Sequence, residues 1–382
     1  MDAKPKVLYL AAGNSIHTTR WASAIAERGW DVHLATLHDP QPELSKSVIV
    51  HRGAARPRLG YFTGARWARR LWKELKPDLV HAHYASGYGL MGALTGAHPL
   101  LLSVWGCDVY DFPETSPFHR CLMRWNLKSA DQILSTSKAM AERTRTLLDR
   151  PITVTPFGID TNLFTPAVRR ETTIVSGVRI DPADIVIGTI KTLEPKYGVE
   201  YLIDAFHLVA QRHPSLPLKL VIVGGGGLRP HLERQVCRLG IASRTAFTGP
   251  VGHTQVPGYT RLLDVGAYLS VFDSESFGVS VLEACACAKP VVVSNVGGLP
   301  EVVLDGITGL VVPPRSSESA AVALERLILD LDLRRRLGME GRRRVEEVYS
   351  WKASVDIMLD IYQGVLEESR EGRRNDRILA DA

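Results

Sequence analysis

Short apolar runs that do not alternate with polar residues recur along this chain, and they constrain its fold more than any other feature. In the first half they occupy residues 7–12, 32–36, 79–83, 101–105, 132–135 and 152–155. In the second half they occupy residues 185–190, 218–223, 265–271, 290–294 and 309–312. Such runs, rich in β-branched residues and separated by helical patterns, indicate parallel sheets that are buried on both faces.

The strand–helix pattern pauses between residues 160 and 182, which suggests a linker near residue 170. A chain of 382 residues is also long for one compact core, so two α/β halves are expected. Ligands of such folds bind beyond the carboxyl ends of the strands, and two halves that face each other would form a cleft. The loops that follow strands are therefore the places to look for chemistry.

Composition and charge narrow the class of protein. Hydrophobic residues make up 45% and charged residues 23%, as in soluble globular proteins, and no apolar run is long enough to span a bilayer. The first apolar run is too short for a signal peptide, and five scattered cysteines favour a reducing compartment over a disulfide framework. The net charge of +5 fits an anionic ligand or membrane surface, while no nucleic-acid-binding module is recognisable.

The stretch ESFGVSVLE, residues 275–283, carries an acidic residue at each end of an apolar segment that begins a helix. The N–H groups of its first turn would be free to bind an anion, and Gly278 would let a ligand approach the backbone. Glu275 and Glu283 lie on about the same side of the helix, where they suit the hydroxyl groups of a nucleotide-sugar. The alternative is that Glu275 caps the helix and Glu283 is solvated.

Two further loops follow strands in the second half. Lys191 and Lys196 lie between a strand and a helix, either as phosphate-binding cations or as solvated surface lysines. Four glycines at residues 224–227 suggest a dinucleotide-binding loop, but Arg229 occupies the third glycine position of that motif and no acidic strand end follows. We therefore interpret the glycines as a tight turn.

Three loops of the first half are weaker candidates. Gly13 and a helix start follow the first strand, and His17 beside them is a base, a hydroxyl ligand or a structural residue. Asp108 follows another strand, where a turn or a helix cap is the alternative. His81 and His83 share one strand face, but no third ligand lies nearby in the sequence, so no metal site is expected.

Residues 64–77, GARWARRLWKELKP, interleave Arg66, Arg69, Arg70 and Lys73 with two tryptophans. An amphipathic basic helix of this kind could rest on an anionic membrane. The alternative is an ordinary outer helix whose residues Trp72 and Leu75 pack inward.

Four motifs in the right order make the chain resemble the retaining glycosyltransferases of family four, which are the group 1 glycosyl transferases with the GT-B fold. The resembling segments are 275–283, an E-x-F-G-x-x-x-x-E element; 188–203, a phosphate-binding loop; 155–164, TPFGIDTNLF; and 295–312, NVGGLPEVVLDGITGLVV. The resemblance implies two Rossmann-like domains, an acceptor-side domain at residues 1–168 and a nucleotide-sugar domain at residues 169–345. It also implies that residues 346–382 form a helix that packs back on the first domain, with a frayed tail.

The resemblance also implies roles for single residues. Glu283 would bind ribose hydroxyls, Lys191 and Lys196 the pyrophosphate, and Glu275 the transferred sugar, with segment 247–251 lining the base. The remaining donor-binding residues would be Ser276, Phe277, Gly278, Val279, Ser280, Gly13 and Val251. The family often has arginine at position 191 and histidine at position 105, where this chain has lysine and tryptophan. Asp108 or His17 would then take over the contact of that histidine with the sugar.

The expected activity is transfer of a sugar from a UDP- or GDP-sugar to an acceptor hydroxyl with retention of configuration, without a metal or another cofactor. A glycan or lipid-linked acceptor, used in building a cell-surface polysaccharide or glycolipid, would place the protein in the cytoplasm or at the inner face of the membrane. A sugar-nucleotide epimerase and a non-catalytic nucleotide-binding protein are the alternatives. The sugar, the acceptor and the oligomeric state do not follow from the sequence.

Overall fold

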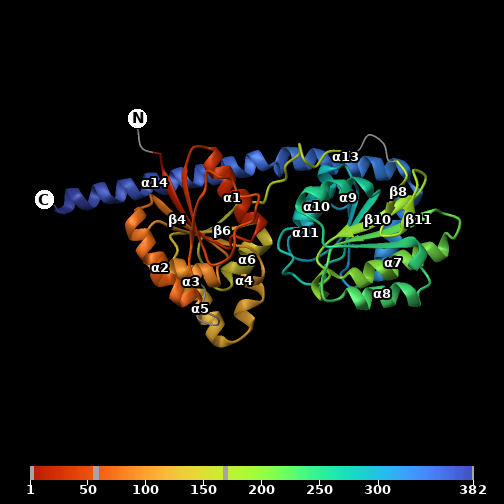
Figure 1. Cartoon of the computed structure of the whole chain (residues 1–382), viewed down its shortest axis with the longest axis horizontal. Helices are drawn as coiled ribbons and strands as arrows, with labels where there is room; N and C mark the ends of the chain where they lie inside the picture. Colours follow the sequence, from red (N-terminus) through yellow and green to blue (C-terminus); the bar gives the residue numbers. More distant parts are fainter. Residues whose placement is uncertain (1–3, 55–59, 167–170, 381–382) are drawn as a thin grey trace. The chain divides into compact units, whose positions relative to one another are not determined.

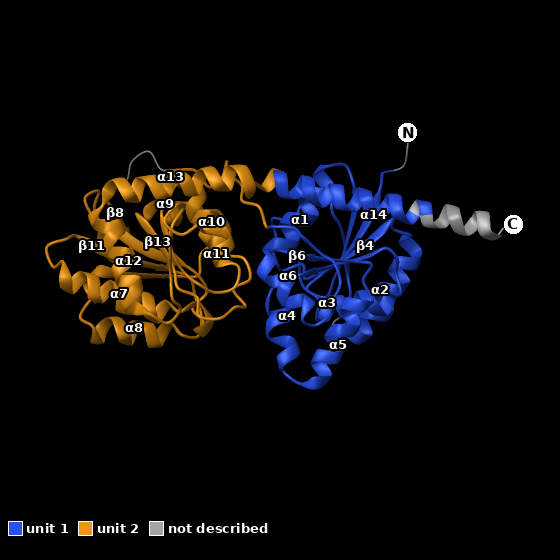
Figure 2. Ribbon diagram, turned by 180° about the vertical axis from the view of Figure 1, so that it is seen from behind, with its two compact units in different colours: residues 1–156, 353–382 blue, residues 157–352 orange. Residues whose placement is uncertain are grey.

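The computed structural model describes residues 4–54, 60–166 and 171–380 (Figure 1). The chain divides into two compact units, one made of Met1–Pro156 with Ala353–Ala382 and the other of Phe157–Lys352 (Figure 2). The predicted boundary between residues 168 and 169 lies outside the described residues, and the division into units comes earlier, after Pro156.

The first unit is built on a seven-stranded parallel sheet in the order β3-β2-β1-β4-β5-β6-β7. Its strands are β1 (Lys6–Leu10), β2 (Asp31–Thr36), β3 (Ile49–Arg52), β4 (Leu79–His83), β5 (Leu100–Val104), β6 (Gln132–Ser135) and β7 (Ile152–Val154). Its helices are α1 (Ile16–Glu27), α2 (Gly60–Leu75), α3 (Gly87–Thr95), α4 (Cys107–Tyr110), α5 (Pro117–Lys128), α6 (Lys138–Arg145) and most of α14 (Trp351–Ala380). Helices cover both faces of the sheet (Figure 1), which is why every residue of β4 and β5 is buried.

The second unit contains a six-stranded parallel sheet in the order β12-β11-β10-β13-β14-β15. Its strands are β10 (Ile185–Ile190), β11 (Leu218–Val223), β12 (Thr245–Gly249), β13 (Val265–Tyr268), β14 (Val291–Ser294) and β15 (Leu310–Val312). Its helices are α7 (Val199–Arg212), α8 (Arg229–Arg238), α9 (Val256–Leu262), α10 (Val279–Ala286), α11 (Leu299–Val302), α12 (Ser317–Leu329) and α13 (Leu331–Val348). Fully buried side chains such as Ile187 and Leu220 stabilise this core by about 1.5–3 kcal/mol each.

In both sheets the order in which the chain adds strands reverses at the centre of the sheet. In the first unit the chain runs outward from β1 through β2 to β3 and then restarts at β4, on the other side of β1. In the second unit it runs from β10 to β12 and restarts at β13, on the other side of β10. The loops after β1 and β4, and those after β10 and β13, therefore flank the two topological switch points, where doubly wound folds bind ligands.

Two short elements differ from the sequence expectation. The edge strand β3 was not expected, because three of its four residues are exposed and it lacks a continuous buried run. The predicted linker at residues 160–182 is wrong in part, since β8 (Thr173–Val175) and β9 (Val178–Ile180) form an antiparallel hairpin. Ser176 and Gly177 form its two-residue turn with positive φ values of 47° and 82°, as a type I′ hairpin requires.

The helix α14 contributes to the core of the first unit. The hydroxyl of Tyr362, which is fully buried, lies 2.7 Å from the hydroxyl of Tyr9 and 2.6 Å from Nδ1 of His81. Nε2 of His81 lies 2.8 Å from Oγ of Ser103, so both imidazole nitrogens are hydrogen bonded. His81 is therefore part of the hydrogen-bonded core of this unit.

Candidate active site

The switch point of the second unit brings together the two loops that carry the strongest sequence candidates. The loop after β10 contains Lys191, and the loop after β13 contains Glu275. Nζ of Lys191 lies 3.0 Å from Oε1 and 2.9 Å from Oε2 of Glu275, in a pair whose side chains are 11% and 8% exposed. A lysine and a carboxylate 84 residues apart are thus joined where the fold favours ligand binding.

Neighbouring groups orient both members of this pair. Oγ of Ser270 donates a hydrogen bond of 3.3 Å to Oε2 of Glu275. Nζ of Lys191 lies 4.7 Å from the centre of the Tyr197 ring, and Nζ of Lys196 lies 4.9 Å from the same ring. Lys191 and Lys196 are therefore brought to one aromatic side chain, and their shared role at a phosphate stays a prediction.

The helix α10 begins directly after this pair. Gly278 precedes its first residue with a φ of 93°, a left-handed conformation that favours glycine. Val279 and Ser280 form its first turn and are partly exposed, so their N–H groups are available to an anion. Ser276 and Phe277 are buried.

Glu283 lies within α10 and is 7% exposed, so the alternative of a solvated helix residue is wrong. Burial and, secondly, the charge of Glu283 raise the pKa of Tyr268 on β13 well above its usual value. The carboxylate of Glu283 is therefore held close to the sheet within the same unit as Glu275 and Lys191.

Two glycines that the sequence analysis did not assign to the site support its backbone. The N–H of Gly298 donates to the carbonyl of Glu275 at 3.0 Å, and the N–H of Gly297 donates to Oδ1 of Asp273 at 3.1 Å. A Cβ on Gly297 would lie 2.2 Å from the carbonyl oxygen of Glu275, and one on Gly298 would lie 2.2 Å from that of Ser276. The paired glycines of the segment NVGG were the available signal, because two backbones approach closely only where side chains are missing.

Gly298→Ala is expected to displace the segment from Glu275 to Gly278, because its methyl group meets backbone atoms that cannot rotate away. We expect a loss of stability of about 2 kcal/mol and at least a tenfold weaker affinity for the nucleotide. Urea unfolding and nucleotide titration measure the two effects. Gly258→Ala is the control, because that glycine lies in α9 of the same unit and a methyl group there would meet nothing within 4 Å. Unchanged nucleotide affinity in Gly298→Ala would show that this loop does not shape the site.

The glycine-rich turn at residues 224–227 is structural, as the sequence analysis preferred. A Cβ on Gly224 would lie 1.9 Å from the carbonyl oxygen of Lys191, and one on Gly226 would lie 2.3 Å from that of Leu193. These glycines let the turn pack against the loop that carries Lys191. Val251, predicted to line the base, is half-buried and packs against the cluster that includes Val175 and Ile180.

The first unit holds the remaining candidates near its own switch point. Gly13 follows β1, and its N–H donates to Oγ1 of Thr36 at 2.8 Å. The ring of His17 packs edge-on against Trp105, with centroids 5.8 Å apart, and His83 packs against the same indole at 4.6 Å. His17 thus lies next to the tryptophan that stands at the family's histidine position.

The structure corrects the prediction that Asp108 contacts the sugar. It is completely buried, and its carboxylate accepts hydrogen bonds from the N–H groups of Ala85 and Gly106, both at 2.8 Å, and of Trp105 at 3.1 Å. Burial raises the pKa of Asp108, while these backbone donors lower it. The side chain fixes the loop after β5, so the alternative of a turn or cap holds and Asp108 is not positioned to contact a sugar.

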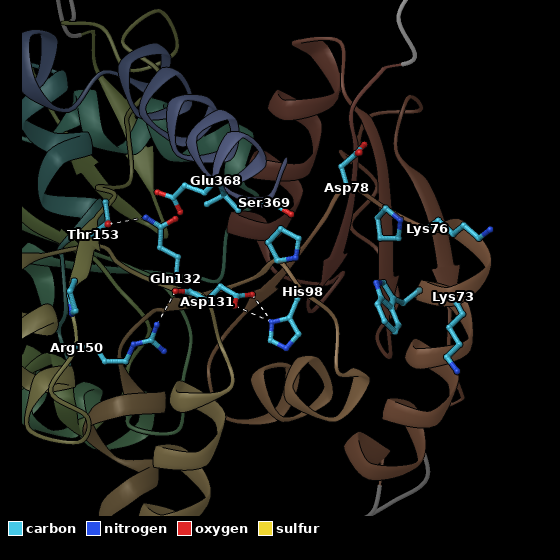
Figure 3. A pocket seen from close by; sticks show the side chains of 15 residues that line it. Lys73, Lys76, Asp78, His98, Asp131, Gln132, Arg150, Thr153, Glu368 and Ser369 are labelled. Carbon is cyan, nitrogen blue, oxygen red and sulfur yellow. Dashed lines mark hydrogen bonds and ion pairs between the residues drawn. The ribbon is translucent and has the colours of Figure 1, made fainter. Parts of the chain in front are cut away.

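A cavity of about 1140 Å³ opens at the amino ends of the strands of the first sheet (Figure 3). Asp78, Pro99, Asp131 and Pro151, which directly precede β4 to β7, line it. Asp131 is paired with His98 at 2.9 Å, and Arg150 donates to backbone carbonyls at 2.7 and 3.0 Å, so these polar groups already have partners. The cavity lies at the amino ends of the strands and is distinct from the candidate site.

Within residues 4–54, 60–166 and 171–380, His, Cys, Asp and Glu side chains do not gather in threes around a possible metal position. Among the helices of these same ranges, none combines the length and the apolar character needed to cross a membrane.

Two family descriptions match the chain. "Glycosyl transferase 4-like" matches residues 6–137, and "Glycosyl transferases group 1" matches residues 171–344. Two similar curated proteins are D-inositol 3-phosphate glycosyltransferases. The one from Saccharomonospora viridis is 30% identical over 94% of this chain and 91% of that protein. The one from Paenarthrobacter aurescens is 34% identical over 92% of this chain and 93% of that protein.

Solved structures support the same architecture. Sucrose-phosphate synthase from Thermosynechococcus elongatus superposes with a TM-score of 0.78 at 21% identity, covering 96% of this chain and all of that one. HepE from Anabaena, solved in complex with UDP, superposes with a TM-score of 0.77 at 20% identity, covering 95% and 100%. The predicted fold and family are confirmed. The chain belongs to the group 1 glycosyltransferases of family four and has the GT-B fold.

Proposed function

We propose that this glycosyltransferase transfers a sugar from a UDP- or GDP-sugar to an acceptor hydroxyl with retention of configuration. The observation that carries the proposal is the pairing of Lys191 with Glu275 beside the first turn of α10. A cation, a carboxylate and free N–H groups at a switch point suit a ligand with both sugar hydroxyls and phosphates.

In the proposed reaction the bond between the anomeric carbon and the nucleotide phosphate breaks first. Lys191, Lys196 and the first-turn N–H groups of α10 stabilise the departing diphosphate, which is electrostatic preorganisation. Lys191 has three N–H donors, so it can bind a phosphate oxygen while it remains paired with Glu275. Glu275 then stabilises positive charge at the anomeric carbon, and the acceptor attacks on the face that the diphosphate leaves. The acceptor's proton goes to the departing phosphate oxygen.

The acceptor that we propose is a glycan or a lipid-linked molecule used in cell-surface polysaccharide or glycolipid assembly, at the inner face of the membrane. The curated relatives named D-inositol 3-phosphate glycosyltransferase make a phosphorylated polyol the first alternative acceptor to test. Residues 64–77, most of which lie in α2, carry basic side chains of the proposed membrane contact.

The test begins with a thermal-shift panel of UDP, GDP and ADP, because a ligand that binds only the folded chain raises its melting temperature. Sugar donors of the best nucleotide are then assayed for nucleotide release and for transfer. Proton NMR of the product distinguishes retention from inversion, and a free epimerised sugar-nucleotide would indicate an epimerase instead. Activity should survive EDTA. No shift with any nucleotide contradicts the proposal.

Glu283→Gln is expected to weaken nucleotide binding about tenfold, because the amide keeps the shape of the side chain but loses the charged acceptor for a ribose hydroxyl. Isothermal titration with the nucleotide of the panel measures the effect. The 2′,3′-dideoxy form of that nucleotide is the control ligand, and the variant should bind it as the wild type does. Equal loss for both ligands would assign Glu283 to structure rather than to ribose binding.

A further inference from the structure

Three helices of the first unit form one layer over its sheet. The helix α3 packs between α2 and α5, and Figures 1 and 2 both show these three helices together on the side of the sheet that is opposite to α1 and α14. Their inner faces are buried in one core, to which α2 contributes Ala68 and Leu71 and α5 contributes Met123 and Leu127. Their outer faces therefore form one surface, here called the three-helix face.

The structure changes the interpretation of residues 64–77. Trp72 and Leu75 of α2 pack against the core, as the alternative interpretation of this helix expected, and Trp67 does so as well. The apolar stripe of α2 is thus used within the fold and is not free for lipid. A basic segment without an exposed apolar side would bind a membrane only weakly, so residues outside 64–77 must supply apolar groups.

The three-helix face supplies four exposed apolar side chains. Phe118 and Trp125 of α5 are 66% and 42% exposed, Phe62 of α2 is 48% exposed, and Leu94 of α3 is 37% exposed. Phe118 and Trp125 are seven residues apart and so lie on one side of α5, two turns from each other. Large exposed apolar groups on adjacent elements mark an interaction surface.

The same face concentrates positive charge. Helices α2 and α5 carry seven lysines and arginines against one acidic residue, Glu74, and α3 has no charged residue. This local excess is larger than the +5 of the whole chain. Within the described residues, Arg66, Arg69, Arg70, Lys73, Arg124 and Lys128 form no ion pair. Their charges are available to an anionic partner.

We propose that the three-helix face docks the protein on an anionic lipid bilayer, with Phe118 and Trp125 entering the headgroup region and the cations binding lipid phosphates. Aromatic side chains surrounded by unpaired lysines and arginines are the combination that interfacial binding requires. This proposal assigns the membrane contact of the proposed function to a specific surface, and the purpose of that contact rests on the proposed function. Vesicle binding, however, succeeds or fails independently of nucleotide binding and sugar transfer.

The test is sedimentation with vesicles of phosphatidylcholine alone and of equimolar phosphatidylcholine and phosphatidylserine. The full chain should bind the anionic vesicles and not the neutral ones. The double variant Arg70→Gln with Arg124→Gln should bind roughly thirtyfold more weakly, since each cation contributes about a fivefold factor. Phe118→Ser with Trp125→Ser should weaken binding by about tenfold or more.

Matched controls lie in the second unit. Arg335→Gln with Arg336→Gln removes two exposed cations of α13, and Ile174→Ser removes an apolar side chain that is 70% exposed. Both should bind vesicles within twofold of the wild type. A nucleotide titration of each variant verifies folding and keeps the outcome separate from that of the proposed function.

Three results would overturn the inference. The first is equal binding by the charge variant and its control. The second is a charge effect without an effect of Phe118 and Trp125, which would indicate adsorption without insertion. The third is a wild-type dimer in sedimentation equilibrium that the Phe118 and Trp125 variant abolishes, which would assign the face to a second copy of this chain.

Discussion

Removing the carboxylate of Glu275 in Glu275→Ala is expected to slow turnover of the donor by a factor of about one hundred or more and to destabilise the second unit by about 3 kcal/mol. Both effects follow from the geometry, because Glu275 accepts two hydrogen bonds from Lys191 in a pair that is about nine-tenths buried. Its loss leaves a buried ammonium group without its counter-ion. Nucleotide release and urea unfolding measure the two quantities.

The double variant Glu275→Leu with Lys191→Met separates stability from activity. Replacing both members of a buried ion pair by apolar residues of similar size is often neutral for stability. We therefore expect the free energy of unfolding to return close to the wild-type value while turnover remains lost. Recovery of turnover in the double variant would contradict a direct role of this pair in the reaction. Unchanged stability in Glu275→Ala would contradict the tight coupling that the structure places between the two residues.

The parallel sheets could be predicted because their inner strands are continuous apolar runs, which only a sheet covered on both faces accommodates. The expectation failed where burial is partial. The strand β3 is an exposed edge, and the hairpin of β8 and β9 is small and antiparallel, so neither has a continuous apolar run. The local sequence indicates whether a strand is buried, but it says less about which strand it pairs with.

The candidate site shows the same limit. The positions of Lys191 and Glu275 after strands could be inferred, but their contact depends on β10 and β13 being neighbours in the sheet. The role of Gly297 and Gly298 depends on which backbone they meet, and that backbone is that of residues 273–276. Asp108 was misassigned because a carboxylate after a strand is equally suited to capping loop N–H groups and to binding a ligand.

The first unit is expected to lose about 4 kcal/mol of stability between pH 7 and pH 5. Burial lowers the pKa of His81 to about 3, and burial, with His81 and His17 nearby, lowers the pKa of His83 well below its usual value. A depressed folded-state pKa stabilises the fold above the unfolded value near 6.5, and this stability is lost as the pH falls. Each histidine contributes a slope of about 1.4 kcal/mol per pH unit. The raised pKa of Asp108 acts in the opposite direction, and it does so at lower pH.

Urea unfolding at pH 7, 6 and 5, followed by tryptophan fluorescence, measures this slope, because six of the seven tryptophans lie in the first unit. His83→Phe should reduce the slope by about half, since one buried imidazole then remains and a phenyl ring can occupy the space between Tyr9 and Trp105. His98→Gln is the control, because His98 is exposed and its replacement should leave the slope unchanged. A stability that is constant from pH 7 to pH 5 would mean that His81 and His83 are protonated or hydrated within the fold. The description of His81 and His83 as buried, neutral imidazoles would then be wrong.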